Sequence, residues 1–358
     1  MKTIANFLNL VAAGVLVITS GCVTNVVDEP NENNDNSEKI ILNLTAPEAV
    51  TTRANSDHKL RFTAKMFTFN GSDMDRSSMQ RKELLQGEKG EEGVVDQIVF
   101  TLAPGNKYNI VVFADYIPAN AGKESDGGYK DYYYNTREDR MAFDMYTTPG
   151  ESNSKVSKDF FNNENYDCFC LAITDTKYEA KQEKPMVLKR GVAKVRVVDT
   201  SGKTGNYDLT ASRITHHNSI TLTPGTMGSM QRSESSLSGG VQLLNQKALE
   251  PDKNGESELF YYYTCSSPGN ANGANSGVTN SLSFSLTGPS DTKAYNLSGI
   301  SVAANFVTKV VGDFLSPVTK EDEPEEQPGI DPDAGNILLN ISLSDEEWGN
   351  MNTPWSSN

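Results

Sequence analysis

Short stretches in which apolar and polar residues alternate recur along the chain, and this alternation limits the possible folds more than any other feature. Successive side chains of a strand point to opposite faces of a sheet, so a period of two predicts strands with one apolar face. In residues 59–69, Leu60, Phe62, Ala64 and Met66 form such a face. Strong helical periodicity is absent, so the sequence predicts a mainly β protein.

The segment 97–116 gives the strongest hairpin signal in the chain. It reads QIVFTLAPGNKYNIVVFADY, in which Pro104, Gly105 and Asn106 separate two apolar runs. A turn of this composition between two alternating stretches predicts a β-hairpin. The polar region 118–165 that follows predicts long loops, with one short helix near residues 137–146.

Beyond residue 185 the short strands recur at about ten-residue spacing, which is typical of a β-sandwich. The chain has 358 residues, enough for about two domains of ordinary size. We therefore predict two mostly-β domains in tandem, with a detached strand at each end. The predicted segments are a signal at 1–22, a tether with the first strand at 23–53, domains at 54–186 and 187–316, an acidic proline-rich linker at 317–336, and a last strand with its tail at 337–358.

The first residues predict export. Lys2 is followed by an apolar run from Leu10 to Ile18, which is too short to span a bilayer, and by TSGC ending at Cys22. A small-residue pair before a cysteine resembles a bacterial lipobox, in which Cys22 is lipidated and becomes the new N-terminus. The alternative is an ordinary cleaved signal peptide with an incidental cysteine.

Composition argues against several classes of function. The net charge of −15 repels phosphate backbones, so we expect no nucleic-acid partner. No catalytic motif appears and histidine is scarce, so we predict that the chain is not an enzyme and needs no cofactor. Cys168 and Cys170 lack partners at zinc-binding spacing, so we expect them to be buried thiols and predict no metal site. With Cys265 they make an odd number, so we expect no complete disulfide framework.

The first and last predicted strands share one pattern. Residues 40–45 read IILNLT and residues 337–342 read ILLNIS, so the aliphatic residues, the asparagine and the final hydroxyl coincide. Two such segments could fill the same groove. The apolar stripe of the last strand consists of Ile337, Leu339, Ile341 and Leu343.

Arg53 and Ala54 lie in a Thr- and Asn-rich stretch between the first strand and the main body. Cleavage between them would release the first strand and leave a sheet with an empty position. An open position of this kind accepts a strand from another chain. We therefore predict the last strand of a neighbouring subunit as the replacement.

These features together resemble the fimbrillin family of Bacteroides-type bacteria. The resemblance is carried by Cys22, by TTRA around Arg53, and by LAPGNKYNIVVFADY, VLKRGVAKVRV and ISVAANFVTKVVGDFLS. It implies two transthyretin-like β-sandwich domains, export to the outer membrane as a lipoprotein, and cleavage by an Arg-specific protease. It also implies polymerisation with other fimbrial subunits by strand insertion, in a surface fimbria that supports adhesion.

Two alternatives remain open from the sequence. The chain could be the anchor or tip subunit of such a fimbria, with the last strand folded into its own domain. It could instead be a monomeric surface lipoprotein that binds glycans through aromatic residues in the stretches 131–135 and 259–264, with Tyr132 and Tyr134 as the residues to substitute in a test.

Overall fold

A computed structural model gives the fold of the chain. It describes residues 39–46, 57–70, 73–151, 156–177, 182–223, 226–227, 231–243, 251, 254–266, 279–316 and 340–344. Within these residues the regular structure is strands and three short 3-10 turns, at Lys158–Phe160, Glu164–Tyr166 and Thr204–Asn206, which confirms the mainly β prediction. Residues from Glu38 onward form one compact unit, so separate tandem domains are not confirmed, and the boundary at 186/187 stays a prediction.

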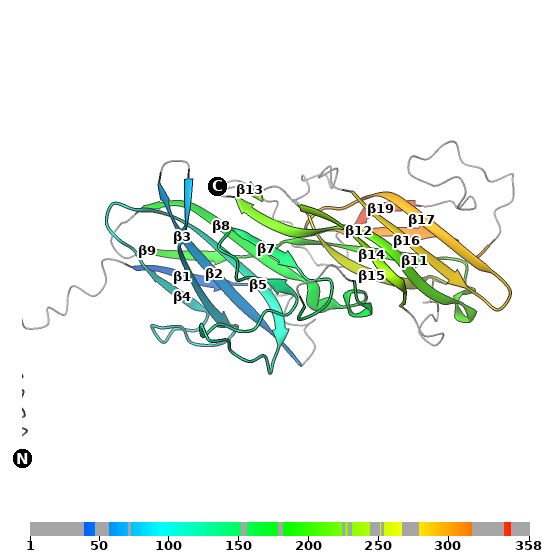
Figure 1. Ribbon diagram of the computed structural model, residues 1–358, viewed down its shortest axis with the longest axis horizontal. Coiled ribbons are helices and arrows are strands. Elements are labelled where there is room, and N and C mark those ends of the chain that lie inside the picture. Colours follow the sequence, from blue (N-terminus) through cyan, green and yellow to red (C-terminus); the bar gives the residue numbers. More distant parts are fainter. Residues whose placement is uncertain are drawn as a thin grey trace, which may run out of the picture. The chain divides into compact units, whose positions relative to one another are not determined.

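Two sheets face each other in the first half of the chain (Figure 1). One has the order β4–β1–β9, and the other has the order β10–β8–β5–β2–β3. Their bounds are β1 Lys39–Thr45, β2 His58–Asn70, β3 Asp73–Leu85, β4 Gln97–Thr101, β5 Lys107–Pro118, β8 Cys168–Lys177, β9 Gln182–Val187 and β10 Lys189–Arg190. Apolar side chains from both sheets form one core between them. This part of the chain is therefore a β-sandwich.

The predicted hairpin at 97–116 is wrong in its pairing, although both of its strands exist. β4 pairs with β1 and β5 pairs with β2 and β8, so the two strands belong to opposite sheets. Ile98 and Phe100 of β4 share the buried core with Ile110 of β5. The turn at Gly105 (φ 80°) thus crosses from sheet to sheet. Alternation shows that a face is buried but does not distinguish a neighbour in the sheet from a neighbour across the core.

Two further sheets are built mainly from residues after 190. One has the order β15–β11–β18–β19, and the other has the order β17–β16–β12–β7–β6, with β13 and β14 also paired to β12. The bounds are β6 Tyr134–Asn135, β7 Ala142–Met145, β11 Val192–Asp199, β12 Asp208–Thr223, β13 Thr226–Met227, β14 Gln231–Gln242, β15 Ser257–Cys265, β16 Thr279–Thr287, β17 Thr292–Ser301, β18 Val307–Gly312 and β19 Asn340–Ser344. A second apolar core joins these two sheets.

The short helix predicted near residues 137–146 is a strand instead. Ala142–Met145 forms β7 and pairs antiparallel with β12, where Phe143 is opposite Ile220. Phe143 is fully buried and stacks on Phe113 of β5, with ring centroids 4.2 Å apart. Pairing and aromatic packing in the folded chain therefore override the weak local preference for a helix.

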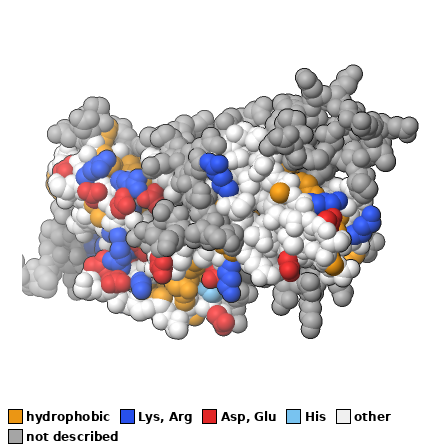
Figure 2. All heavy atoms as spheres, turned by 45° about the vertical axis from the view of Figure 1, so that its right-hand side comes forward, with side chains coloured by type: hydrophobic (Ala, Val, Ile, Leu, Met, Phe, Trp, Pro, Cys, Tyr) orange, Lys and Arg blue, Asp and Glu red, His pale blue; other side chains and the backbone are white. Residues whose placement is uncertain are grey.

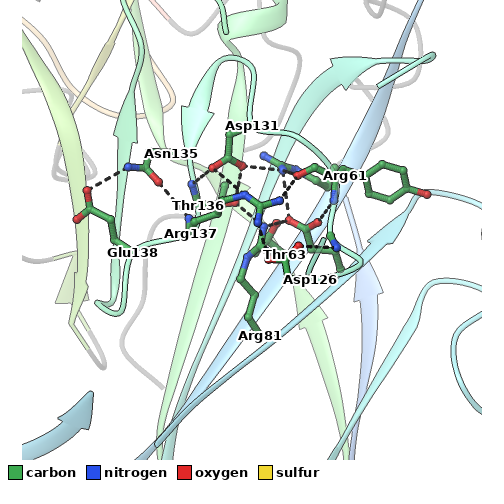
Figure 3. Close-up of polar contacts among 12 residues, drawn as sticks. Arg61, Thr63, Arg81, Asp126, Asp131, Asn135, Thr136, Arg137 and Glu138 are labelled. Carbon is green, nitrogen blue, oxygen red and sulfur yellow. Dashed lines mark hydrogen bonds and ion pairs between the residues drawn. The ribbon is translucent and has the colours of Figure 1, made fainter. Parts of the chain in front are cut away.

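The second face of β2 is buried as well, and it is charged. Arg61 is fully buried and binds the Asp115 carboxylate with two hydrogen bonds, of 2.9 Å from Nε and 2.8 Å from Nη2. Its Nη1 donates to Asp131 Oδ1 at 2.8 Å. Asp131 in turn accepts hydrogen bonds from Thr136, so the cluster fastens the segment around residues 126–138 over the sheet (Figure 3).

Burial and charge oppose each other in this cluster. Burial alone would lower the pKa of Arg61, but Asp115, Glu83 and Asp131 raise it overall, so Arg61 stays cationic. Burial raises the pKa of Asp115 to about 6, although Arg61 acts in the opposite direction. A buried ion pair of this kind is compatible with a stable fold only while both partners are present, because removing one leaves an uncompensated buried charge.

Lys65 makes a similar connection from the same face of β2, four residues further along the strand. Its Nζ donates to the carbonyl oxygens of Glu138, Arg140 and Ala142 at 3.0, 3.2 and 3.4 Å. Burial, followed by repulsion from Arg81, lowers its pKa to about 7. Lys65 therefore ties β2 to the chain that leads into β7.

Cys168 and Cys170 are buried free thiols, as predicted, and Cys265 is one as well. Within the described part of the chain, no group of three or more His, Cys, Asp or Glu residues is arranged to hold a metal ion. None of the helices in the described ranges is long and apolar enough to cross a membrane.

Both end strands pair within sheets of this chain. For β1 this agrees with the prediction that it fills a sheet position before cleavage, whereas the described part of the last strand is paired rather than free. β1 is the middle strand between β4 and β9, and β19 lies at one end of its sheet, next to β18. Unpaired backbone groups are costly where a partner edge is available, so a strand near an open edge pairs with it.

Candidate strand-docking site

β1 lies between two strands, β4 and β9, which we call the walls of its position. It pairs antiparallel with β4 through five residue pairs, from Lys39–Thr101 to Asn43–Gln97. On its other side it pairs parallel with β9 through six, from Ile40–Gln182 to Thr45–Val187. In the described sheet β4 and β9 are joined only through β1 (Figure 1). Removing β1 would leave a gap of roughly 9–10 Å, the width of one strand between two others.

The inward side of β1 fills the core of the first sandwich. Ile40 and Leu42 are fully buried and Leu44 is 6% exposed, so the predicted apolar face is confirmed. Each such side chain contributes about 1.5–3 kcal/mol when buried, as an upper estimate. β1 therefore holds an internal position, and a chain without it would expose a deep apolar groove.

The connection between β3 and β4, residues 86–96, closes over the end of β1. The Leu44 N–H donates to the Asp96 carbonyl at 2.9 Å. Asp96 has a positive φ of 52°, and its Oδ1 accepts the Gly87 N–H at 2.7 Å. A Cβ on Gly90 would lie 1.9 Å from the Gln97 carbonyl oxygen, so only glycine allows this approach. The wall formed by β4 is therefore rigidly supported.

Polar contacts lie on the outward side of β1. Gln97 Nε2 donates to Asn43 Oδ1 at 3.0 Å, directly across the β1–β4 ladder. Lys39 Nζ and Glu92 Oε1 form an ion pair of 2.9 Å, with both side chains about one-third exposed. An exposed pair of this kind contributes little stability. The amide pair is more shielded, since Gln97 is only 8% exposed.

The predicted last strand is described only in part. β19 pairs antiparallel with β18, with Ile341 opposite Val310 and Leu343 opposite Thr308. Ile337 and Leu339 lie outside the described residues, as do Cys22, Arg53 and Ala54. The roles predicted for all of these residues therefore stay predictions.

The apolar face of β1 is apparent in the sequence, whereas Gln97 and the residues that support it carry no local signal. The asparagine shared by residues 43 and 340 was visible as part of the common pattern. Its partner on β4 was not, because the pairing of β1 with β4 joins residues 54 positions apart.

The tyrosines suggested for glycan binding are largely inside the protein. Tyr134 is fully buried, and its hydroxyl donates to the Tyr166 carbonyl at 2.5 Å. Tyr132 is only partly exposed and packs edge-on against Tyr133, with ring centroids 4.9 Å apart. In the second aromatic stretch, Tyr262 and Tyr263 are fully buried as well. These rings act in packing, which argues against a sugar-stacking surface formed by them.

Charges of both signs share the described surface. On the face in Figure 2, Lys and Arg side chains lie close to Asp and Glu side chains. Arg140 pairs with Asp144, and Lys82 Nζ pairs with Glu91 Oε1 at 2.6 Å. The local distribution on this face is therefore mixed, although the whole chain carries a net charge of −15.

A protein-family model described as a family of unknown function (DUF6562) matches residues 30–337. The chain belongs to this family. The match includes β1 and its two walls, and it ends before β19. A comparison with curated proteins finds no match.

Solved structures similar to this DUF6562 chain are distant in sequence. The tip fimbrial protein Mfa3 from Porphyromonas gingivalis, with a C-terminal truncation, is 13% identical over 86% of this chain and 99% of its own, with a TM-score of 0.37. The fimbrial anchor protein Mfa2 from the same organism is 10% identical over 85% and 98%, with a TM-score of 0.38. A putative adhesin from Bacteroides ovatus is 11% identical over 75% and 84%, with a TM-score of 0.42.

Proposed function

We propose that the chain is a structural subunit of a cell-surface fimbria that polymerises by strand insertion and supports adhesion. In this proposal it is exported to the outer membrane as a lipoprotein through Cys22. An Arg-specific protease then cuts between Arg53 and Ala54 and releases β1 with its lipid anchor. The C-terminal strand of another subunit fills the vacated position.

The observation that carries this proposal is the place of β1 between two walls that do not pair with each other in the described sheet. Loss of β1 would expose the backbone edges of both β4 and β9 together with the apolar core behind them. Such an opening favours capture of an extended strand, since the incoming backbone can satisfy both edges.

The number of ladder pairs favours exchange of the C-terminal strand. Within the described part of the chain, β19 is paired on one side, by five residue pairs with β18. A strand in the position of β1 makes five pairs with β4 and six with β9. Moving β19 from its own sheet into this position of a neighbour would therefore break one ladder and form two. The 20 residues from 317 to 336 could span about 66 Å when extended, which allows such a reach.

Truncating the chain before Gly335 tests this proposal. The truncated chain should still be exported and folded, because β19 contributes one edge ladder and leaves the first sandwich intact. It should lose the heat-sensitive high-mass ladders that the full-length chain forms on a denaturing gel, because no C-terminal strand is left to insert.

The matched control removes only residues 346–358 and keeps β19 complete. This control should form ladders at the level of the full-length chain. Equal ladders from the longer truncation would eliminate strand insertion by the C-terminus, and loss of ladders from both would point to a role of the tail itself.

Replacing Arg53 by Ala is expected to leave the uncleaved precursor at the cell surface, because an Arg-specific protease needs the guanidinium. The measurement is the mass of the surface protein together with metabolic labelling of its lipid. Arg76→Ala is the control, since Arg76 is an exposed arginine of β3 within the main body. Normal maturation of the Arg53 variant would rule out this cleavage site.

A further inference from the structure

We infer that Gln97 sets the register of the strand that occupies the position between β4 and β9, by hydrogen bonding to an asparagine side chain at one place in that strand. In the unprocessed chain this asparagine is Asn43. In an assembled filament it would be Asn340 of a second copy of this chain. The inference about Asn340 rests on the proposed function, whereas the contact with Asn43 is present in the structure.

The geometry at Gln97 suits this role. Asn43 and Gln97 are direct cross-strand partners, and their side-chain amides are joined by a 3.0 Å hydrogen bond. The neighbouring Leu44 N–H donates to the Asp96 carbonyl, so residues 44 and 96 form a hydrogen-bonded pair. Hydrogen-bonded and non-hydrogen-bonded pairs alternate along antiparallel strands, so residues 43 and 97 form a closer pair without backbone hydrogen bonds. The contact of Gly90 with the Gln97 carbonyl restrains the main chain at this point. Gln97 is therefore a fixed donor rather than a mobile surface side chain.

On the other side of β1, the residue of β9 that pairs with Asn43 cannot select a register through a side-chain hydrogen bond. Pro185 of β9 is the backbone partner of Asn43, and proline has neither an N–H nor a polar side-chain atom. Its presence also fits an edge strand, the place that β9 has in the described sheet. Discrimination between registers by a side-chain hydrogen bond at this level must therefore come from β4.

The C-terminal strand needs such selection because its apolar stripe is uniform. Ile337, Leu339, Ile341 and Leu343 repeat with a period of two, so a shift by two residues would still present aliphatic side chains to the core. Such a shift would place Leu338 or Ser342 opposite Gln97 in place of Asn340. Leu338 would leave the buried amide of Gln97 unpaired and weaken that arrangement by about tenfold. The Ser342 hydroxyl could accept a hydrogen bond from Gln97, but its side chain is shorter than that of asparagine.

A set of charge variants in the full-length chain tests this inference. Gln97→Glu keeps the precursor folded, because the Asn43 amide can donate to the new carboxylate. Asn340→Asp keeps insertion into an unchanged subunit, because Gln97 can donate to the new carboxylate. The double variant places two carboxylates opposite each other on a shielded face, and Gln97→Glu with Asn340→Lys places opposite charges there.

On a denaturing gel, each single variant should form high-mass ladders at the level of the unaltered chain. The double variant Gln97→Glu with Asn340→Asp should form at least tenfold fewer. The double variant Gln97→Glu with Asn340→Lys should recover them. The matched control is Gln97→Glu with Ser342→Asp, which moves the carboxylate two residues along the same strand and should retain ladders. Equal loss from the control would contradict a register set at position 340.

A disulfide measurement gives a second readout that does not depend on how the charge variants fold. Gln97→Cys with Asn340→Cys should give ladders that resist heat until a reductant is added, whereas Gln97→Cys with Ser342→Cys should not. The register assignment would be overturned if the unaltered chain formed ladders but the crosslink appeared only in the Ser342→Cys variant or in neither variant. Strand insertion itself would still stand in that case. An unaltered chain that forms no ladders would overturn the proposed function itself.

Discussion

Replacing Arg61 by Met is expected to lower the free energy of unfolding of the full-length chain by about 3–5 kcal/mol. The variant removes the guanidinium but leaves Asp115 fully buried and Asp131 7% exposed, both without their main partner. An uncompensated buried carboxylate must either stay charged at a high cost or take up a proton. Equilibrium unfolding in denaturant measures the loss.

Two controls separate this effect from ordinary surface electrostatics. Lys82→Met removes an exposed pair with Glu91 and should change stability by about 1 kcal/mol or less. Arg61→Lys keeps a positive charge but loses the two-point contact with Asp115, so an intermediate loss is expected. A loss below about 1 kcal/mol in the Arg61→Met variant would show that the cluster does not fasten the covering segment.

Replacing Leu42 by Ala is expected to lower the free energy of unfolding of the unprocessed chain by about 2–5 kcal/mol. Leu42 is fully buried in the core of the first sandwich, and the backbone of β1 is held on both sides. The neighbours therefore cannot close readily around the cavity that the substitution creates. The measurement is again equilibrium unfolding of the full-length chain in denaturant.

Thr45→Ala is the matched control on the same strand. Thr45 is exposed, and its backbone carbonyl still accepts the Leu188 N–H in the variant. Its effect should stay within about 0.5 kcal/mol. If Leu42→Ala were equally mild, β1 would not be an integral part of the core, and the argument for a groove left by its removal would fail.

The strands themselves could be predicted from the sequence because their apolar faces are local patterns. The alternation of Ile40, Leu42 and Leu44 predicts the buried face of β1, and that of Leu60, Phe62 and Ala64 predicts the inner face of β2. In both cases one face packs on a core, and a period of two is the direct result.

Pairing could not be predicted, because it joins distant residues. Asn43 meets Gln97, and Phe143 meets Ile220, without any local signal. The same limit explains Arg61. Its position on the polar face of β2 suggests exposure, yet a segment about 70 residues later supplies Asp131 and covers it. Charged residues become buried only when partners from elsewhere in the chain satisfy them.

The mixed pairing of β1, antiparallel to one wall and parallel to the other, has a geometric consequence for any filament built through this site. A replacement strand that reproduces both hydrogen-bond patterns has to enter in the same direction as β1. Successive copies would then be related by a single repeated rotation and translation, and every copy would face the same way. Such a fibre has polarity: one terminus ends in a vacant acceptor and the opposite terminus in an unused tail, so growth at the two ends is chemically distinct.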